Sequence, residues 1–394
     1  MNIKASNNGM AIKMMRCLLL SALCFNPMVV SFTQPLMAAY QRRRIKSALG
    51  SKTSPSVLCI GDALLDCIAN EDARGFTVDE MVSNHAWTAW PGGAPANVAT
   101  TLCKLGTTSA YAGCVGQDQD GDDIQSLLEN IGVDVTLLRR TADHPTRRVM
   151  VTRDSSGDRA FAGFYEGRSA GAFADAYFDM TTVQDAPSEA IIKGAEWLVC
   201  STLSLAFEHS AEAVNHLVDR GLAGGARLCV DVNWRNVFWS NEQVAREAIL
   251  VFAQRADVVK LTDEEAMWLL GIPSALACPQ DVSKAFPRAF AVLVTAGEKG
   301  ASYCIFDHCG KIEPFQVDVK ETTGAGDAFT AGFLHALLSL QDDTLKEEPR
   351  VAENMVRFAA AVGALTCTSE GAIAAQPTMN EVESFLIHGQ KVWA

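Results

Sequence analysis

The feature that most constrains the fold is an alternation of short apolar runs with helical stretches in the second half of the chain. The helical stretches lie near 209–221, 242–254 and 263–270. Such an alternation predicts parallel strands joined by crossover helices that cover both faces of one sheet. Ligands bind such sheets at the carboxyl ends of the strands. The apolar runs of strand length are Trp197–Ser201, Arg227–Val232, Ala256–Leu261 and Ala291–Thr295.

The length and charge of the chain narrow the class of protein. A chain of 394 residues that is 48% apolar and 20% charged is globular and can bury a substantial core. Its formal net charge is −13, but residues 1–52 carry eight Lys or Arg and no acid, which leaves −21 for residues 53–394. A body this acidic argues against nucleic acid as the main partner. It does not exclude nucleotides, which local amides and metal can hold.

The first 52 residues are predicted to be a targeting leader rather than part of the fold. A basic start is followed by the apolar run Cys17–Phe25, which is too short to span a bilayer. A basic, Ser-bearing, acid-free segment follows, and the whole resembles the bipartite leaders of proteins sent to secondary plastids, with Ser31-Phe32 as a candidate junction. We therefore expect a plastid location and no membrane contact after the leader is removed. A plain signal peptide, a mitochondrial presequence and an N-terminal arm on a cytoplasmic protein remain alternatives.

The cysteines are expected to be free. All twelve are scattered singly, and no Cys-x-x-Cys pair occurs. Several, such as Cys59, Cys200 and Cys229, lie among apolar neighbours, where free cysteine behaves as a small hydrophobe. Disulfide frameworks are typical of small secreted domains instead. The pattern therefore predicts a reducing compartment and no structural metal site.

One stretch, Glu321–Phe329, joins small residues to a lone acid at the start of an apolar helix. Gly324, Ala325 and Gly326 precede Asp327, and the residues that follow are apolar on nearly every face, which is typical of a buried helix. Small residues at a helix N-terminus let an anion approach free backbone N–H groups. An acid there repels an anion, but it suits the task of taking a proton from a nucleophile that attacks a bound phosphoryl group. The alternative is that Asp327 only caps the helix.

Two stretches near the start of the body suit the recognition of sugar hydroxyls. The apolar run Val57–Ile68 is expected to form an opening strand that is interrupted by Gly61 and Asp62 and ends at Asp66. A carboxylate at the end of a buried strand is costly unless it is paired, hydrated or used, and sugar hydroxyls are natural partners for it. The pair Gly92-Gly93 lets backbone approach a ligand at the start of a predicted helix, and Asn97 lies in the first turn of that helix.

Several stretches, in order over about residues 57–378, resemble the ribokinase-like (PfkB) carbohydrate kinases. Glu321–Phe329 resembles the second signature of that family, D-T-T-G-A-G-D-x-F, with Glu321 in place of the first Asp. Gly113–Gly121 resembles the first signature, and Gly92–Ala99 resembles the G-G-A-P-A-N-x-A motif of fructokinase-like members. The resemblance implies a ribokinase-like three-layer α/β/α sandwich with a mostly parallel sheet and a small β-strand lid.

The same resemblance divides the chain. It implies one carbohydrate kinase domain over residues 53–394, with lid strands near 67–91 and 145–165. Within the second of these ranges, two short strand-like runs are joined at Ser156-Gly157, which predicts a hairpin. Any homodimer is expected to form through this lid.

The resemblance also implies a role for each residue that matches a family motif. Asp327 matches the catalytic base, and the amides of Gly324, Ala325 and Gly326 match the anion hole. The residues implied to bind ligands are Asp66, Gly92, Gly93, Asn97 and Arg235 for the sugar, Lys260, Thr295, Gly297, Gly300 and Gly326 for ATP, Glu265 for Mg²⁺ through water, and Glu321 and Thr323 for a monovalent cation such as K⁺.

The absence of two sequence motifs argues against two other classes of enzyme. The chain has no G-x-x-x-x-G-K-[ST], so P-loop kinase chemistry is unsupported. It has no G-x-G-x-x-G after the opening strand either, which removes the best argument for a dinucleotide oxidoreductase.

The resemblance favours ATP-dependent phosphorylation of a sugar primary hydroxyl, with fructose as the first choice of substrate. A kinase for 2-keto-3-deoxygluconate-type acids is the first alternative, with Arg235 as partner for the carboxylate. A non-catalytic fructokinase-like plastid interaction protein is the second. Two departures from the family motifs keep that alternative open. One is Glu321 in the second signature, and the other is Val232 in place of the usual Pro in Asp231–Arg235, which resembles the family's D-x-N-x-R.

Overall fold

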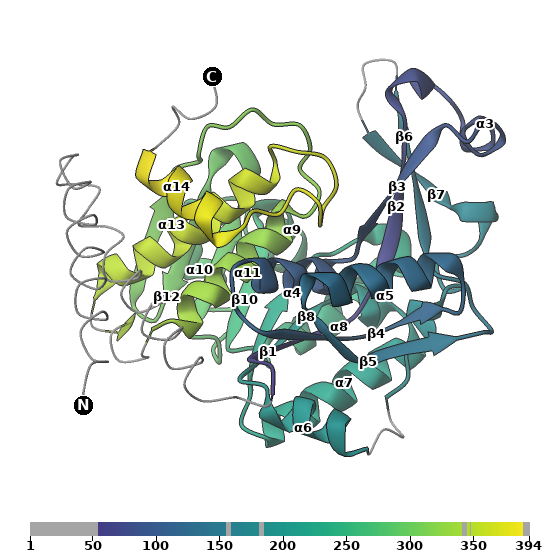
Figure 1. Ribbon diagram of the computed structural model, residues 1–394. Helices are drawn as coiled ribbons and strands as arrows, with labels where there is room; N and C mark the ends of the chain where they lie inside the picture. Colours follow the sequence, from purple (N-terminus) through teal and green to yellow (C-terminus); the bar gives the residue numbers. More distant parts are fainter. Residues whose placement is uncertain (1–53, 155–158, 181–184, 341–344, 347, 389–394) are drawn as a thin grey trace, which may run out of the picture.

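The computed structural model of the protein describes residues 54–154, 159–180, 185–340, 345–346 and 348–388 (Figure 1). The predicted leader, residues 1–52, and the predicted turn at Ser156-Gly157 lie outside the described residues. Within the described ranges, no helix is both long enough and apolar enough to cross a bilayer.

A nine-stranded sheet runs through the body in the order β13-β12-β11-β10-β9-β8-β1-β4-β5. The pairs from β11–β10 through β4–β5 are parallel, and the pairs β11–β12 and β12–β13 are antiparallel. The predicted mostly parallel sheet is therefore confirmed. The strands are β1 Val57–Ile60, β4 Ser109–Gly116, β5 Asp134–Thr141, β8 Trp197–Ser201, β9 Arg227–Asp231, β10 Val258–Thr262, β11 Ala291–Thr295, β12 Ala301–Ile305 and β13 His308–Ile312.

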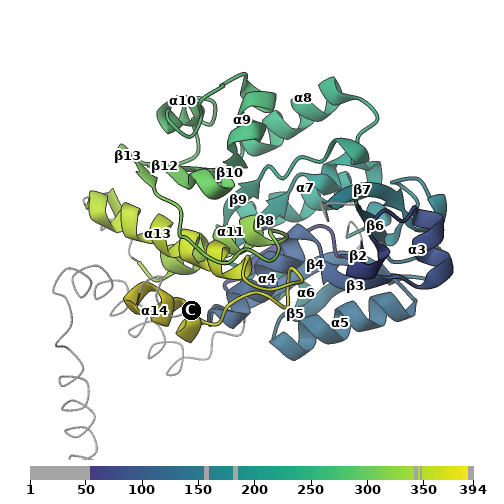
Figure 2. The same cartoon turned by 90° about the horizontal axis from the view of Figure 1, so that it is seen from above.

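Helices cover both faces of this sheet, because its strands are apolar on both sides. In β1, Val57 and Cys59 belong to one hydrophobic core and Leu58 and Ile60 to the other. Figure 2 shows α13 and α14 on the opposite side of the sheet from α8 and α9. The first core is covered by α4 Ala94–Lys104, α5 Gln119–Ile131, α11 Ala325–Leu338, α13 Pro349–Thr366 and α14 Met379–His388, and the second by α6 Ala186–Gly194, α7 Glu208–Ala223, α8 Glu242–Ala253, α9 Asp263–Leu270 and α10 Pro279–Ser283.

Helix α11 is buried, as its all-round apolar sequence predicts. It packs between α4 and α13. A Cβ atom at Gly332 would lie 3.0 Å from both the Cα of Ala359 and the Cγ2 of Val362, so this glycine sets how closely α13 approaches. We call the nine-stranded sheet and its helices the platform.

A second sheet, in the order β3-β2-β6-β7, stands off one side of the platform, at the upper right of Figure 1. Strand β2 pairs antiparallel with β3 and parallel with β6, and β6 pairs antiparallel with β7. We call this sheet the lid. Its elements are β2 Leu64–Ala69, α3 Val78–Asn84, β3 Trp87–Gly92, β6 Arg148–Arg153 and β7 Arg159–Phe164.

The expectation of one opening strand over Val57–Ile68 was wrong. The backbone turns at Gly61, whose φ of 143° favours glycine, and the two halves become β1 of the platform and β2 of the lid. Asp66 therefore lies in the middle of a lid strand, not at the end of the opening strand. The carboxylate that follows the opening strand belongs to Asp62, which is buried.

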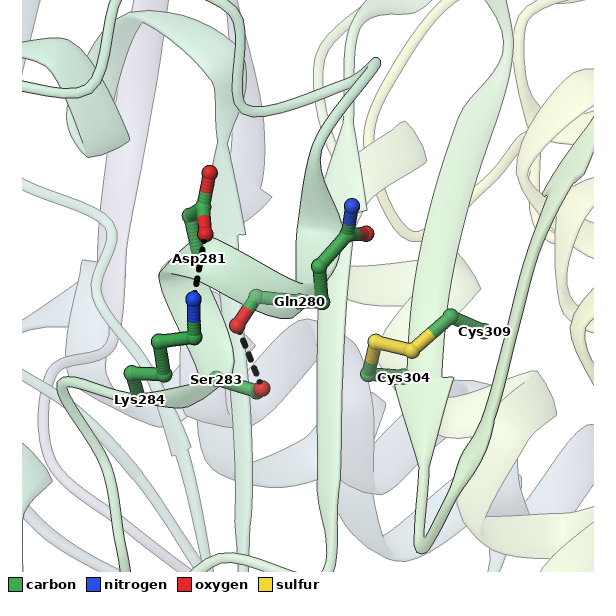
Figure 3. The surroundings of a disulfide bond; sticks show 6 residues. All are labelled: Gln280, Asp281, Ser283, Lys284, Cys304 and Cys309. Carbon is green, nitrogen blue, oxygen red and sulfur yellow. Dashed lines mark hydrogen bonds and ion pairs between the residues drawn. A yellow bond between two sulfur atoms is a disulfide. The ribbon is translucent and has the colours of Figure 1, made fainter.

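The expectation that every cysteine is free was also wrong. Cys304 of β12 and Cys309 of β13 form a disulfide beside α10 (Figure 3). The antiparallel register places the two residues opposite each other, with their Cα atoms 4.1 Å apart. The separation of five residues is compatible with such a hairpin pair, but the pairing depends on the strand register. Cys59, Cys200 and Cys229 are free and buried, as expected.

Candidate active site

Asp327 lies in the first turn of α11, at the carboxyl edge of the platform sheet. The N-cap of the helix is Gly324, whose φ of 79° places it in the left-handed region. No side chain caps the helix, so Asp327 does not have the capping role that the sequence left open. A Cβ atom at Gly324 would lie 2.9 Å from the Cβ of Ala372 in a neighbouring loop, which explains why this position holds a glycine.

The carboxylate of Asp327 accepts a hydrogen bond from Asn97 of α4. The distance between Asn97 Nδ2 and Asp327 Oδ2 is 2.8 Å, and the two residues are 230 positions apart in the sequence. Asn97 is only 4% exposed. Its Oδ1 has no hydrogen-bond partner among the described residues. A buried amide oxygen of this kind is costly unless a ligand donates to it.

The surroundings of Asp327 raise the pKa of its carboxyl group to about 7. Burial is the main cause, because it disfavours the charged form, and the carboxylate of Asp231 adds to the rise. The hydrogen bond from Asn97 and the positive charges of Lys260 and Arg235 act in the opposite direction. A carboxyl group with such a pKa gives up its proton near neutral pH, as a general base must.

Lys260 and Asp231 form a buried ion pair below Asp327. The Nζ of Lys260 lies 3.1 Å from Asp231 Oδ1, and the hydroxyl of Thr330 in α11 donates to Asp231 Oδ2 at 3.1 Å. Burial opposes the charge of Lys260, but Asp231, Glu265 and Asp327 raise the pKa of this ammonium above its usual value. A Cβ atom at Gly326 would lie 2.9 Å from the Lys260 Nζ, so the ammonium sits directly beneath the predicted anion hole.

The three predicted anion-hole amides differ in their present contacts. The N–H of Ala325 donates to the carbonyl of Thr322 at 3.2 Å. Ala372 packs closely against Gly324, and the Lys260 ammonium lies against Gly326. A site for phosphate oxygens at these amides stays a prediction.

Glu265, the residue predicted to hold magnesium through water, fastens two loops in the structure. Its Oε1 accepts from the N–H of Trp234 at 2.9 Å, and its Oε2 accepts from the N–H of Thr262 at 2.8 Å. With the Thr262 hydroxyl it forms a capping box at the start of α9. Each carboxylate oxygen can accept a second bond, so these contacts leave room for a water. The magnesium role stays a prediction.

The predicted sugar-side residues meet where the lid joins α4. Asp66 pairs with Trp90 and Val149 on the neighbouring lid strands. A Cβ atom at Gly92 would lie 3.1 Å from Asp66 Oδ2, and Gly93 is the N-cap of α4 with a φ of 103°. Strand pairing thus places Asp66 beside Gly92, and the glycine pair leads directly into α4, which carries Asn97.

Arg235 is exposed, and its positive charge acts on Asp327. Its Nη1 donates to the carbonyl of Trp234 at 2.9 Å.

The remaining predicted ATP residues lie at the turn after β11. Thr295 pairs in register with Thr262 of β10, and Gly297 and Gly300 have φ values of 52° and 89°. Both glycines therefore serve a tight turn at the same sheet edge as Lys260. Binding of ATP by these residues stays a prediction.

Glu321 and Thr323, the predicted monovalent-cation residues, contact each other. The Thr323 hydroxyl donates to Glu321 Oε1 at 2.7 Å, and the N–H of Gly371 donates to Glu321 Oε2 at 2.9 Å. Glu321 is 5% exposed and so ties the segment before α11 to the loop after α13. The structure shows this fastening role, and cation binding stays a prediction.

Two polar residues near the site were missed by the sequence reasoning. Asp62 is buried, accepts from the N–H of Ala94 at 3.2 Å and from the Ser201 hydroxyl at 3.1 Å, and so anchors the start of α4. Gln376 donates through its Nε2 to the backbone oxygen of Asn97 at 2.9 Å. The position of Asp62, directly after a buried strand, was a usable signal, whereas nothing in the sequence marks Gln376.

Comparisons with known proteins identify the family of the chain. Residues 54–379 match the sequence description pfkB family carbohydrate kinase. The chain is 34% identical to "Probable fructokinase-6, chloroplastic" of Arabidopsis thaliana over 352 residues, which cover 88% of this chain and 86% of that protein. Together these matches confirm the predicted family and the predicted enzyme class.

Two solved structures are similar to this one. Fructokinase with bound ATP from Xylella fastidiosa is 30% identical to this chain, with a TM-score of 0.72. The superposition covers 84% of this chain and 98% of the other. Fructokinase from Vibrio cholerae O395 in fructose, ADP and calcium ion bound form is 28% identical, with a TM-score of 0.69 and the same two coverages. These similarities confirm the predicted three-layer ribokinase-like fold.

Proposed function

The chain belongs to the pfkB family of carbohydrate kinases, and from that premise we propose that it transfers the γ-phosphoryl group of ATP to a primary hydroxyl of fructose. The observation that carries the proposal is the carboxylate of Asp327, which has a pKa of about 7 and a hydrogen bond from Asn97 at the start of a buried helix. The similar proteins named as fructokinases, one with fructose and ADP bound, support the choice of sugar and nucleotide.

Asp327 acts as the general base in this proposal. It takes the proton of the sugar hydroxyl as the oxygen attacks the γ-phosphorus, and its raised pKa suits proton transfer near neutral pH. The amides of Gly324, Ala325 and Gly326 stabilise charge on the phosphate oxygens, with Ala325 giving up its 3.2 Å bond to Thr322. The buried ammonium of Lys260 beneath Gly326 adds positive charge at the same point.

The sugar lies between the lid and α4. Asp66 and the unpartnered Oδ1 of Asn97 accept from sugar hydroxyls, and the glycine pair Gly92-Gly93 lets the sugar approach the backbone. Such contacts hold one hydroxyl in line with the phosphorus. Holding the reacting atoms in this geometry lowers the activation barrier of phosphoryl transfer.

Two cations belong to the proposal. Mg²⁺, held through water by Glu265, neutralises charge on the ATP phosphates when it is bound. Glu265 suits an indirect contact because backbone N–H groups already occupy one acceptor position on each of its oxygens. A monovalent cation would lie near Glu321 and Thr323, where each oxygen of the Glu321 carboxylate accepts one hydrogen bond and can take a second partner through its other lone pair.

The experiment that tests the proposal is a coupled assay of ADP release across a panel of sugars. Fructose should give the highest kcat/KM with ATP and Mg²⁺ present. A preference for 2-keto-3-deoxygluconate would instead favour the acid-sugar alternative, with the exposed Arg235 as its carboxylate partner. A protein that releases no ADP with any sugar would overturn the kinase proposal in favour of the non-catalytic interaction protein.

We also propose that residues 1–52 are a leader that directs the protein to a plastid. Their basic, acid-free composition differs from the acidic body, and one similar protein carries the description chloroplastic. N-terminal sequencing of the protein from its native source should find a start between about Phe32 and Thr53, with the usual uncertainty of a few residues at such boundaries. An intact Met1 on the active protein would contradict the proposal that residues 1–52 are a leader.

We further propose that any homodimer forms through the lid.

A further inference from the structure

The loop between α13 and α14 contacts four parts of the candidate active site. We call residues 370–376 the bridging loop. Its Gly371 donates to Glu321 and is so close to the Trp90 ring of the lid that a Cβ atom would overlap it. Its Ala372 packs on Gly324, the N-cap of α11. The loop therefore lies against the lid, the predicted cation residues and the predicted anion hole at once.

The fourth contact joins the bridging loop to α4. Gln376 is 5% exposed and donates through Nε2 to the Asn97 carbonyl at 2.9 Å. Lys104, at the other end of α4, donates to the carbonyls of Ile373 and Gln376 at 2.5 and 3.3 Å. Both ends of α4 are thus tied to the loop, but only the Gln376 side chain reaches the residue that contacts Asp327.

The Gln376 side chain is buried in a way that packing alone does not explain. Its Oε1 has no hydrogen-bond partner among the described residues, which costs free energy in a buried position. An apolar residue of similar size would avoid that cost. The hydrogen bond that the amide donates to Asn97 is therefore the reason for a polar side chain at this position.

We infer that Gln376 is a positioning residue, which holds the first turn of α4 so that the Asn97 side chain keeps its hydrogen bond to Asp327. The hydroxyls of Thr100 and Thr101 also donate to the Asn97 carbonyl, at 3.0 and 2.8 Å, but both residues belong to the same helix. Gln376 is the donor that fixes this carbonyl relative to another element. The inference deepens the proposed function and rests on it for its kinetic consequences.

The effect on Asp327 has a defined direction. The groups that face its carboxylate are Asn97 from α4, Asp231 and Lys260 from the sheet, and Arg235 from the loop after β9. Of these, only Asn97 is held by Gln376. A weaker bond from Asn97 removes stabilisation of the charged carboxylate, so the pKa of Asp327 must rise.

The test compares Gln376→Leu with the parent and with Lys104→Met, which loosens the same loop without touching Asn97. In Gln376→Leu we expect kcat/KM for fructose to fall about three- to tenfold, the range for loss of one neutral hydrogen bond, while KM for ATP stays within about twofold. The pKa of Asp327, followed by NMR of protein with ¹³C-labelled Asp carboxyl groups, should rise in Gln376→Leu and stay at the parental value in Lys104→Met. An Asp327→Asn sample assigns the signal.

The NMR titration needs no turnover, so the inference and the proposed function fail separately. An inactive parent would overturn the proposed function only. An unchanged pKa of Asp327 in folded Gln376→Leu would overturn the inference, and so would an equal rise in Lys104→Met, because loop anchoring would then be the cause. If Gln376→Leu does not fold, the unbranched Gln376→Met provides the same two readouts.

Discussion

The platform and the lid contribute to the candidate active site in different ways. Every residue of β1, β4 and β8 in the platform is buried, whereas most residues of β3 and β6 in the lid are at least partly exposed. The platform supplies Asp327 and the Asp231–Lys260 ion pair. The lid supplies Asp66 from the middle of β2. The charges of Asp231 and Lys260 beside Asp327 therefore lie in the buried sheet, whereas Asp66 is the partly exposed residue of the otherwise buried strand β2.

Arg147 joins the two regions. Its side chain is fully buried and lies between the rings of Phe164 of the lid and of Phe173, Phe207 and Phe238 outside it, with 4.8–5.4 Å from its guanidinium carbon to each ring centroid. Its Nε donates to Asp175 at 2.8 Å, and its backbone oxygen accepts from the N–H of Leu65 in β2 at 2.9 Å. Cation–π contacts of this kind are strongest when water is excluded.

The largest effect is expected for the charge that the platform places at the reaction centre. Asp327→Asn keeps the shape of the side chain but cannot accept a proton, so kcat should fall about 10²–10⁴-fold while fructose and ATP still bind. The melting temperature at pH 8 should not fall, because the change removes a buried charge. Asp79→Asn, in the exposed first turn of α3, is the matched control and should keep parental turnover. If Asp327→Asn turned over near the parental rate, Asp327 would not be the general base.

The next effect concerns the junction. Arg147→Met leaves the carboxylate of Asp175 buried without its partner, and breaking a buried pair in this way costs about 3–5 kcal/mol in the free energy of unfolding. Adding Asp175→Asn should recover part of this loss, since the second change removes the unpaired charge. Chemical denaturation of the two single variants and the double variant measures the coupling. Additive losses would show that the two residues act independently and do not join lid and platform as a pair.

A smaller and more selective effect is expected in the lid. Asp66→Ala should weaken fructose use by about 1.5–3 kcal/mol, or roughly ten- to more than a hundredfold, because a charged acceptor for a hydroxyl is lost. Nucleotide binding should stay close to the parental value. Asp66→Asn keeps an acceptor and should lose less. Isothermal titration with fructose and with an ATP analogue checks both claims. Equal fructose affinity in Asp66→Ala and the parent would show that Asp66 does not bind the sugar.

The sequence predicted the platform better than the lid for physical reasons. Strand-length apolar runs such as Trp197–Ser201 are buried on both faces, so their composition alone identifies them. The all-round apolar pattern after Asp327 likewise predicted the buried helix α11. The run Val57–Ile68 is equally apolar, but its break at Gly61 divides it between two sheets, and apolar composition carries no information about that turn.

The candidate site shows the same limit. Local motifs identified Asp327 and Asn97 separately, but the hydrogen bond between them depends on how α4 packs against α11. The contact of Gln376 with Asn97 spans 279 positions and follows no local pattern, so it could not be predicted. The Cys304–Cys309 pair depends on the register of one hairpin, which the spacing of the two cysteines did not disclose on its own.

The pH dependence of kcat/KM for fructose tests the central claim most directly, because the base must be unprotonated in the free protein to accept a proton. The pKa of Asp327 is raised from 3.8 to about 7, so the carboxylate is charged above that pH and protonated below it. We predict that kcat/KM is level near pH 8 and falls about tenfold for each pH unit below 7, while the protein stays folded. A kcat/KM that stays level from pH 8 to about pH 5.5 in folded protein would contradict the account, because a base with a pKa near 7 would be mostly protonated across the lower part of that range.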